Sequence, residues 1–248
     1  MTTVETVMGI PMSIDVRDDL PQAQVAEAVA AAFASLHAAD RRFSRHRPDS
    51  ELSALDRREL APGDGSADVR EVLAIGERMR EATGGAFDVR LPGGGFDTDG
   101  VVKGWAAERA ARVLRAHGLR TFCLNAGGDV VVGAAPDGSP GWNVGVRSPR
   151  HPDRMLAVLT VAEAAVATSG AYERGEHIRD GRTGAPAHEL ASATVFAGDL
   201  TTADVLATAV FALGEAGVAW ATGHGARGVL ALTADGRLLA AGDLPLAR

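Results

Sequence analysis

The chain has 248 residues, of which 25 are Lys or Arg and 32 are Asp or Glu, so its formal net charge at pH 7 is −7. No block of Lys and Arg gathers on a predicted helix, and we therefore expect no nucleic-acid partner. No apolar run approaches the roughly 18–20 residues that span a bilayer, and the N-terminus shows no signal-peptide pattern. These features predict a cytoplasmic protein that does not enter a membrane, folded as a single domain over residues 1–248.

The first half of the chain predicts one strand-like segment and then three helices. Residues 4–16 are typical of a strand, and apolar residues that recur every three or four positions predict a helix from Leu20 onward. The same period predicts helices over residues 67–82 and 103–117. Each of these is followed by glycine, a common residue just beyond helix C-termini.

In the second half the hydrophobic period changes to two, which is typical of strands. Six strands are predicted, at residues 122–125, 129–132, 142–146, 155–161, 165–168 and 193–196. Helices at residues 202–214 and 215–221 precede a final hairpin around Asp235-Gly236. Strands grouped in the middle and helices around them predict an α+β fold with central antiparallel strands flanked by helices. Cys123 lies in a predicted strand, where an inert thiol is expected.

The stretch from Glu176 to Gly184 gathers an imidazole, carboxylates, guanidinium groups and a hydroxyl. His177 is a candidate for proton transfer, because the ordinary pKa of histidine lies nearest working pH. Gly181 and Gly184 permit a sharp turn and a close approach to a ligand. Taken alone, the stretch favours a charged hairpin loop without a catalytic role, and only the other motifs change that interpretation.

Asp204 and Thr208 lie four positions apart on a predicted helix, so they share one face. A carboxylate and a hydroxyl oxygen side by side suit Mg²⁺. The alternative is that Thr202 or Asp204 caps the helix N-terminus while Thr208 bonds back to a carbonyl. On this pair alone, the capping alternative is favoured.

Three glycine-containing segments complete the candidates. The loop from Asp97 runs into a helix that begins near Lys103, where free N–H groups can meet an anion; an acidic capping loop is equally consistent. Residues 125–129 predict a tight hairpin, which could also face a ligand. Residues 168–170 follow a strand and offer two hydroxyls, suited to a phosphate or to a simple turn. Neither a P-loop nor a G-x-G-x-x-G, G-x-S-x-G or H-E-x-x-H motif is present.

Taken in chain order, these segments resemble the ApbE family, the FAD:protein FMN transferases. The similar segments are Met8-Gly9, residues 42–53, Gly85-Ala86-Phe87-Asp88, residues 97–104, residues 125–129, Thr168-Ser169-Gly170, residues 177–184 and residues 203–209. Each one is short, but eight in a single order are specific. The resemblance implies the α+β, T-fold-like single domain of that family.

The resemblance also implies a reaction and a site. The family transfers the FMN part of FAD to a Ser or Thr hydroxyl of a target protein, releases AMP and uses Mg²⁺. By resemblance, Asp204 and Thr208 would hold Mg²⁺ with a backbone carbonyl near Gly100, and His177 would be the general base or would orient the hydroxyl. The FAD contacts implied in this chain are Met8, His46, Phe87, Asp88, Asp97, Lys103, Thr168, Ser169 and Gly170.

The chain departs from the family pattern in ways that keep other functions open. Gly181 stands where proline is usual, which predicts a less rigid loop, and His46 stands where tyrosine is frequent. Only eight residues separate Asp88 from Asp97, where the family usually has a longer segment. Two alternatives therefore remain: an FAD pyrophosphatase that uses water in place of the protein hydroxyl, and a flavin-binding protein without catalysis.

Overall fold

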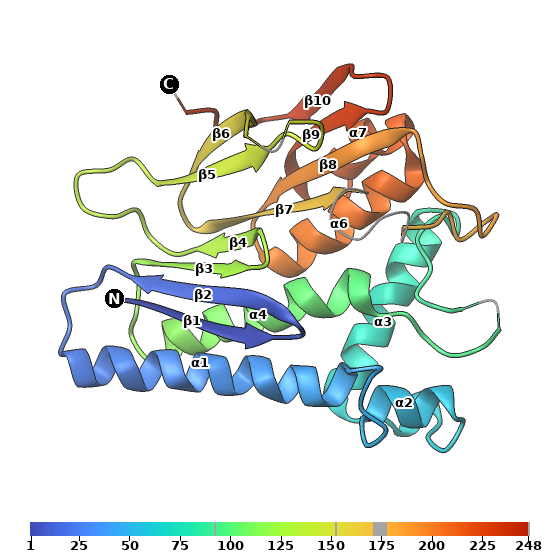
Figure 1. Cartoon of the computed structure of the whole chain (residues 1–248), viewed down its shortest axis with the longest axis horizontal. Helices are drawn as coiled ribbons and strands as arrows, with labels where there is room; N and C mark the ends of the chain where they lie inside the picture. Colours follow the sequence, from blue (N-terminus) through green and yellow to red (C-terminus); the bar gives the residue numbers. More distant parts are fainter. Residues whose placement is uncertain (92, 152, 171–177, 248) are drawn as a thin grey trace.

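An eight-stranded antiparallel sheet organises the molecule, with the strand order β1-β2-β3-β4-β7-β8-β9-β10 (Figure 1). The computed structural model describes residues 1–91, 93–151, 153–170 and 178–247. A separate two-stranded ribbon pairs β5 with β6. The strands are β1 Thr2–Val7, β2 Ile10–Val16, β3 Phe122–Ala126, β4 Asp129–Val132, β5 Trp142–Arg147, β6 Met155–Val161, β7 Ala164–Gly170, β8 Leu190–Ala197, β9 Ala226–Thr233 and β10 Leu238–Gly242.

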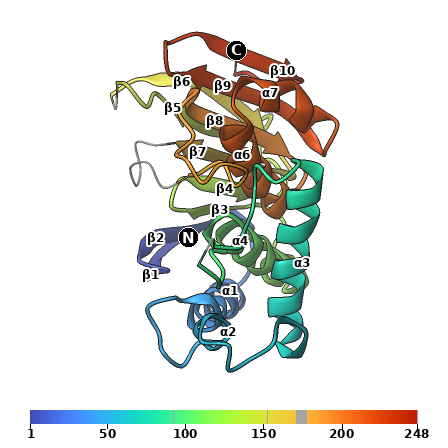
Figure 2. The ribbon, with the colours of Figure 1, turned by 90° about the vertical axis from the view of Figure 1, so that its right-hand side faces the viewer.

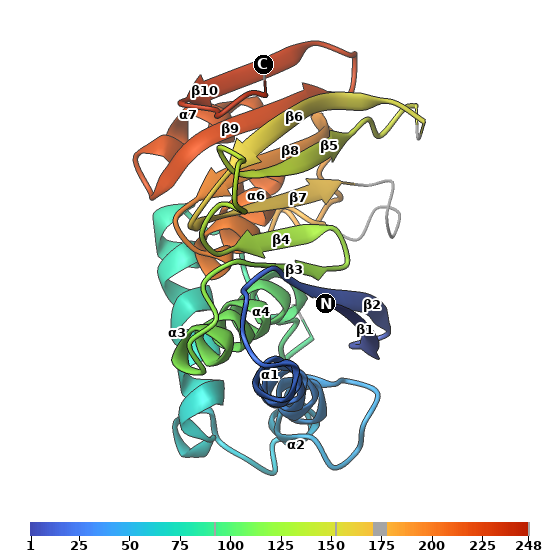
Figure 3. The ribbon, with the colours of Figure 1, turned by 90° about the vertical axis from the view of Figure 1, so that its left-hand side faces the viewer.

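Helices cover one face of this sheet. Helices α1, α4, α6 and α7 pack against the strands, as the edge-on view shows (Figure 2). The β5–β6 ribbon lies on the opposite face (Figure 3). The helices are α1 Gln22–Phe43, α2 Glu51–Asp56, α3 Ala67–Ala82, α4 Asp99–Ala116, α6 Leu200–Leu213 and α7 Glu215–Thr222. The α+β prediction with antiparallel strands flanked by helices is thereby confirmed.

Two hydrophobic cores form because successive strand residues point to opposite sides of a sheet. In β4, Val131 belongs to the main core beneath the helices. Val130 and Val132 belong to the smaller core under the β5–β6 ribbon, with Val144 and Leu159. Covering both faces explains why β4 has an unbroken apolar run and not an alternating one.

The N-terminal segment differs from its prediction. Residues 4–16 are not one strand, because Met8 and Gly9 both have positive φ and form a two-residue turn between β1 and β2. Such a turn reverses the chain into a hairpin with the twist that antiparallel strands need. Helix α2 was not predicted; its N-terminus is marked by Ser50, whose side chain accepts a hydrogen bond from the amide of Ser53.

Helix α4 begins earlier than the sequence indicates. The predicted start at Lys103 is wrong by about one turn, since the helix begins at Asp99. Gly100 and Gly104 obscure this start because glycine is a poor helix former. No described helix combines the length and the apolar character needed to cross a bilayer.

Candidate functional site

Two helices meet closely where α4 carries two glycines. A Cβ added to Gly104 would lie 2.5 Å from Cβ of Asp204 and 2.6 Å from the carbonyl oxygen of Leu200. A Cβ added to Gly100 would lie 3.2 Å from Cγ2 of Thr208. Each pair is four positions apart and shares a helix face, so the two glycines of α4 face the two oxygen-bearing residues of α6. The absence of side chains on α4 is what allows this approach.

Asp204 is buried against the backbone of α4. Its residue is 2% exposed, and its Oδ2 accepts a hydrogen bond of 2.8 Å from the amide of Gly104. Burial raises the pKa of Asp204 to about 7; the ammonium of Lys103 opposes this rise and the carboxylate of Asp129 adds to it. The ionised form of Asp204 is therefore poorly hydrated, and the positive charge of Lys103 offsets only part of the cost of burying it.

The N-terminus of α6 is capped by a different residue. Asp199 is the N-cap: its Oδ1 accepts from the amide of Thr202 at 2.9 Å and its Oδ2 from the hydroxyl at 2.7 Å. The interpretation of Asp204 as a capping residue is therefore wrong. The hydroxyl of Thr208 lies 3.1 Å from Oγ of Ser169 on β7, within hydrogen-bond distance. The side chains of Asp204 and Thr208 thus both border the space between α4, α6 and the sheet.

Asp129 also lies in this space, although the sequence motifs did not single it out as a site residue. Its residue is 2% exposed, its Oδ1 accepts from the amide of Thr168 at 2.9 Å, and its Oδ2 lies 2.5 Å from Nζ of Lys103. The sequence signal that could have found it is a carboxylate directly before three valines of a buried strand. A buried charge is costly unless it has a partner.

The two hydroxyls of Thr168-Ser169 point to opposite faces of β7, as alternate strand residues do. Ser169 faces α6, whereas Oγ1 of Thr168 lies 2.9 Å from Oγ1 of Thr194 on the neighbouring strand. Because β7 continues to Gly170, these residues are part of the strand and do not follow it. The polar cluster therefore consists of Lys103, Asp129, Ser169, Asp204 and Thr208.

Phe87 lies near this polar cluster, whereas the next residue, Asp88, pairs with Arg90. The ring of Phe87 packs against the first turn of α4, 3.4 Å from a Cβ built on Gly100. The carboxylate of Asp88 accepts hydrogen bonds from the amide and the guanidinium of Arg90. Burial raises the pKa of Asp88, but the bonds to Arg90 outweigh burial, so its pKa lies below the usual value.

His177 lies outside the described residues. The residues after it form a hairpin that packs on the loop of residues 85–88. The amide of Gly181 donates to the carbonyl of Ala86 at 2.9 Å, and a Cβ at Gly181 would lie 2.5 Å from the carbonyl oxygen of Gly85. Proline lacks this N–H donor. Glycine here holds the hairpin to the loop of residues 85–88 by a hydrogen bond and a close contact.

The remaining predicted residues lie in turns and loops. Oδ1 of Asp97 accepts from the amide of Asp99 at 3.2 Å, at the start of α4. Its Oδ2 lies 3.6 Å from the guanidinium of Arg45, the neighbour of the exposed His46. Met8 is half-buried in the β1–β2 turn. The structure thus brings Asp97 together with the segment that contains His46.

The donor set of the polar cluster fits a magnesium ion. Asp204, Thr208 and Ser169 offer one carboxylate and two hydroxyl oxygens, and Mg²⁺ prefers oxygen ligands. Within the described ranges, no group of three or more His, Cys, Asp and Glu residues could hold a metal. Such a sparse set suits Mg²⁺ that is held by one or two carboxylates together with substrate phosphates.

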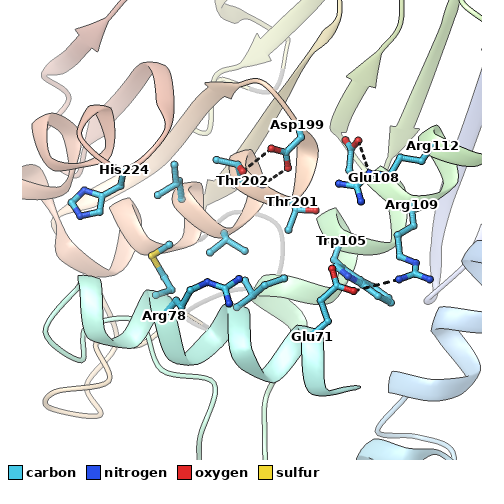
Figure 4. Close-up of a pocket in the computed structure, with 14 residues that line it drawn as sticks. Glu71, Arg78, Trp105, Glu108, Arg109, Arg112, Asp199, Thr201, Thr202 and His224 are labelled. Carbon is cyan, nitrogen blue, oxygen red and sulfur yellow. Dashed lines mark hydrogen bonds and ion pairs between the residues drawn. The ribbon is translucent and has the colours of Figure 1, made fainter. Parts of the chain in front are cut away.

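A separate cavity lies between α3, α4 and the N-terminus of α6 (Figure 4). This α3–α4–α6 cavity has a volume of about 270 Å³, below the ~300–1,000 Å³ of typical small-molecule sites. The three acids that line it have partners: Glu71 pairs with Arg109, Glu108 pairs with Arg112, and Asp199 accepts a hydrogen bond from the hydroxyl of Thr202 (Figure 4). It is therefore a poor candidate for a flavin site.

Comparison with known sequences places the chain in a family. The profile of the ApbE family matches residues 8–93 and 90–231, and the chain belongs to this family. The "FAD:protein FMN transferase" of Treponema pallidum is 30% identical over 85% of this chain and 78% of its own length. The enzyme of the same name from Rhodobacter capsulatus is 34% identical over 71% of this chain but only 36% of its own length.

Solved structures agree with the fold. The ApbE protein of Thermotoga maritima superposes with a TM-score of 0.84 at 23% identity and covers 96% of both chains. The flavin transferase ApbE of Vibrio cholerae superposes with a TM-score of 0.83 at 21% identity, over 97% of this chain and 96% of its own. At these identities, the likeness shows a shared fold.

Proposed function

We propose that this chain is an Mg²⁺-dependent FAD:protein FMN transferase, which moves the FMN part of FAD to a Ser or Thr hydroxyl of a target protein and releases AMP. Family membership and curated relatives that carry this enzyme name support the proposal. The observation that carries it within this chain is the close approach of Gly100 and Gly104 to Asp204 and Thr208. This close approach brings carboxylate and hydroxyl oxygens next to a lysine. Cleavage of a pyrophosphate requires such metal ligands and a positive charge near the phosphates.

Asp204 and Thr208 would hold Mg²⁺, with the carbonyl of Gly100 as a further ligand. When bound, the ion offsets the charge that develops as the phosphoanhydride bond breaks. Lys103 adds a positive charge next to the same phosphates, and Ser169 adds a hydroxyl. The residues proposed to contact FAD are Met8, His46, Phe87, Asp88, Asp97, Lys103, Thr168, Ser169 and Gly170.

The transfer needs one bond to form and one to break. The hydroxyl oxygen of the acceptor forms a bond to the phosphorus of the FMN part, and the bond from this phosphorus to the bridging oxygen breaks, so that AMP leaves. The proton of the hydroxyl passes to His177 as general base, or His177 orients the hydroxyl for attack. Lys103 stabilises the negative charge of the departing phosphate.

A transfer assay tests the proposal. The protein is incubated with FAD, Mg²⁺ and a target peptide that carries a Ser/Thr acceptor, and a fluorescent flavin adduct and AMP are measured. An adduct together with AMP supports transfer, whereas FMN and AMP without an adduct support the pyrophosphatase alternative. FAD that binds and stays intact with every divalent metal leaves only the flavin-binding alternative.

Variants of two nearby histidines sharpen this test. His177→Ala is expected to abolish turnover, because no other group is proposed to accept the proton. The matched control is His188→Ala, a change of an exposed histidine in the same part of the chain, which should leave turnover unchanged. Full activity of the His177→Ala variant would contradict the assigned role.

Two predictions from the sequence stay predictions. A single domain over residues 1–248 predicts one cooperative unfolding transition, which calorimetry tests. A cytoplasmic location is tested by fractionation of the native cells.

A further inference from the structure

Three charged side chains from α4, β4 and α6 meet in a poorly hydrated space. Nζ of Lys103 lies 2.5 Å from Oδ2 of Asp129 and 3.5 Å from Oδ1 of Asp204. The side chains of both aspartates are 3% exposed, and that of Lys103 is 23% exposed. When all three are ionised, two carboxylates share one ammonium. The shorter distance makes Asp129 the nearer partner of Lys103, so Asp204 is the carboxylate with incomplete compensation.

We propose that Asp129 is a positioning residue that keeps Lys103 closer to itself than to Asp204 and thereby leaves the Asp204 carboxylate more accessible to a divalent cation. This inference rests on the proposed function, which puts Mg²⁺ at Asp204. The carboxylates of Asp129 and Asp204 would then compete for Lys103, and the charge of Asp129 would set the position of the ammonium.

Both carboxylates are fixed by backbone amides, whereas the ammonium is not. Oδ1 of Asp129 is held by the amide of Thr168, and Oδ2 of Asp204 is held by the amide of Gly104. Lys103 carries its charge at the end of a flexible four-carbon stem. If Asp129 loses its charge, Asp204, 3.5 Å from Nζ, can still pair with Lys103. The ammonium would then move toward the position where a metal ion needs a free oxygen.

The variant Asp129→Asn removes the charge and keeps the shape, including an oxygen for the amide of Thr168. We expect Mg²⁺ binding to weaken by roughly tenfold or more, as is typical when a group that supports a metal ligand is changed. Adding Lys103→Met removes the competing ammonium and should restore most of the lost Mg²⁺ affinity. The double variant should still bind FAD more weakly than wild type, since a phosphate contact is lost.

The experiment titrates Mg²⁺ into the FAD-bound protein without an acceptor and follows flavin fluorescence, while Mg²⁺ alone is tested by the shift in unfolding temperature. Glu108→Gln is the matched control: it neutralises another buried acid of α4, which hydrogen-bonds the amide of Leu200 and the guanidinium of Arg115. Its Mg²⁺ affinity should equal that of wild type.

Each outcome decides the inference. An Asp129→Asn variant with wild-type Mg²⁺ affinity, or a double variant as weak as Asp129→Asn, overturns it while the proposed function stands. If Asp129→Asn does not fold, Lys103→Met alone decides: tighter Mg²⁺ binding supports competition, and unchanged or weaker binding overturns it. If wild type itself does not respond to Mg²⁺, the magnesium site of the proposed function fails and this inference fails with it.

Discussion

The two ends of the contact between α4 and α6 handle charge in opposite ways. At the α3–α4–α6 cavity, each lining acid has an arginine or a helix N-terminus as its partner: Glu71 pairs with Arg109, Glu108 pairs with Arg112, and Asp199 caps α6 (Figure 4). At the polar cluster, Asp129 and Asp204 share Lys103. At one end of the contact, the acidic side chains have nearby partners. At the other end, two buried carboxylates share one ammonium.

Side-chain size accounts for this difference. At the polar cluster, Gly100 and Gly104 let the backbone of α4 touch α6 and exclude water. At the cavity, α4 carries two large side chains, Trp105 and Arg109, which stack on each other and line the cavity. Buried charges without full compensation cost stability and tend to mark functional sites. The comparison predicts that changes at the cluster affect activity and that changes at the cavity affect stability.

Within the contact between α4 and α6, the largest expected effect comes from Asp204→Asn. Because the metal contributes several kcal/mol of charge stabilisation, transfer should fall by roughly 10²–10³-fold or more. The unfolding temperature should not fall, since the amide oxygen can still accept from Gly104 and a buried charge is removed. The control Glu71→Gln makes the same charge change at the cavity and should keep full activity. Full transfer by Asp204→Asn would show that the metal assignment is wrong.

Gly104→Ala should come next, because it removes the close contact itself. The added Cβ would overlap Asp204 and Leu200, and overpacking of this kind costs about 1–3 kcal/mol of unfolding free energy. Urea unfolding measures the loss, and transfer should fall with it because Asp204 is displaced. Gly63→Ala is the control, since nothing lies within 4 Å of its added Cβ. Equal stability of the two variants would contradict the contact.

Asp199→Ala tests the cavity end. Loss of the N-cap of α6 should lower the unfolding free energy by about 1 kcal/mol. FAD binding and transfer at 25 °C should be unchanged, because the cap lies outside the polar cluster. A loss of Mg²⁺ affinity in this variant would mean that the two ends of the contact are coupled.

The smallest effect concerns Cys123 on β3, which lies opposite Asp15 of β2. Burial raises the pKa of its thiol to about 11, and the carboxylate of Asp15 adds to the rise. A thiol reagent at pH 8 should therefore react more slowly with the folded protein than in urea. Between the ordinary value of 9.0 and about 11, the unfolded chain loses the thiol proton first, so stability falls as pH rises. Cys123→Ser should lack this decline.

Local patterns predicted elements well where one periodicity holds throughout. Helix α3 and strands β4 and β6 have the predicted bounds of residues 67–82, 129–132 and 155–161. The start of α4 was missed because its two glycines serve contact with another helix, which no local propensity reports. Asp129 was missed as a site residue for a related reason: its partner Lys103 comes from a different element.

The sequence by itself determined the α+β class, most of the strands and helices, and the residue types that a metal and a phosphate require. Only the tertiary structure decided which of these residues meet. It directs Ser169 toward Thr208 and Thr168 toward Thr194, and it brings the amide of Gly104 to Asp204, 100 positions away along the chain. The physical reason is that periodicity orders neighbours along one element, whereas contacts between elements follow from packing of the whole core.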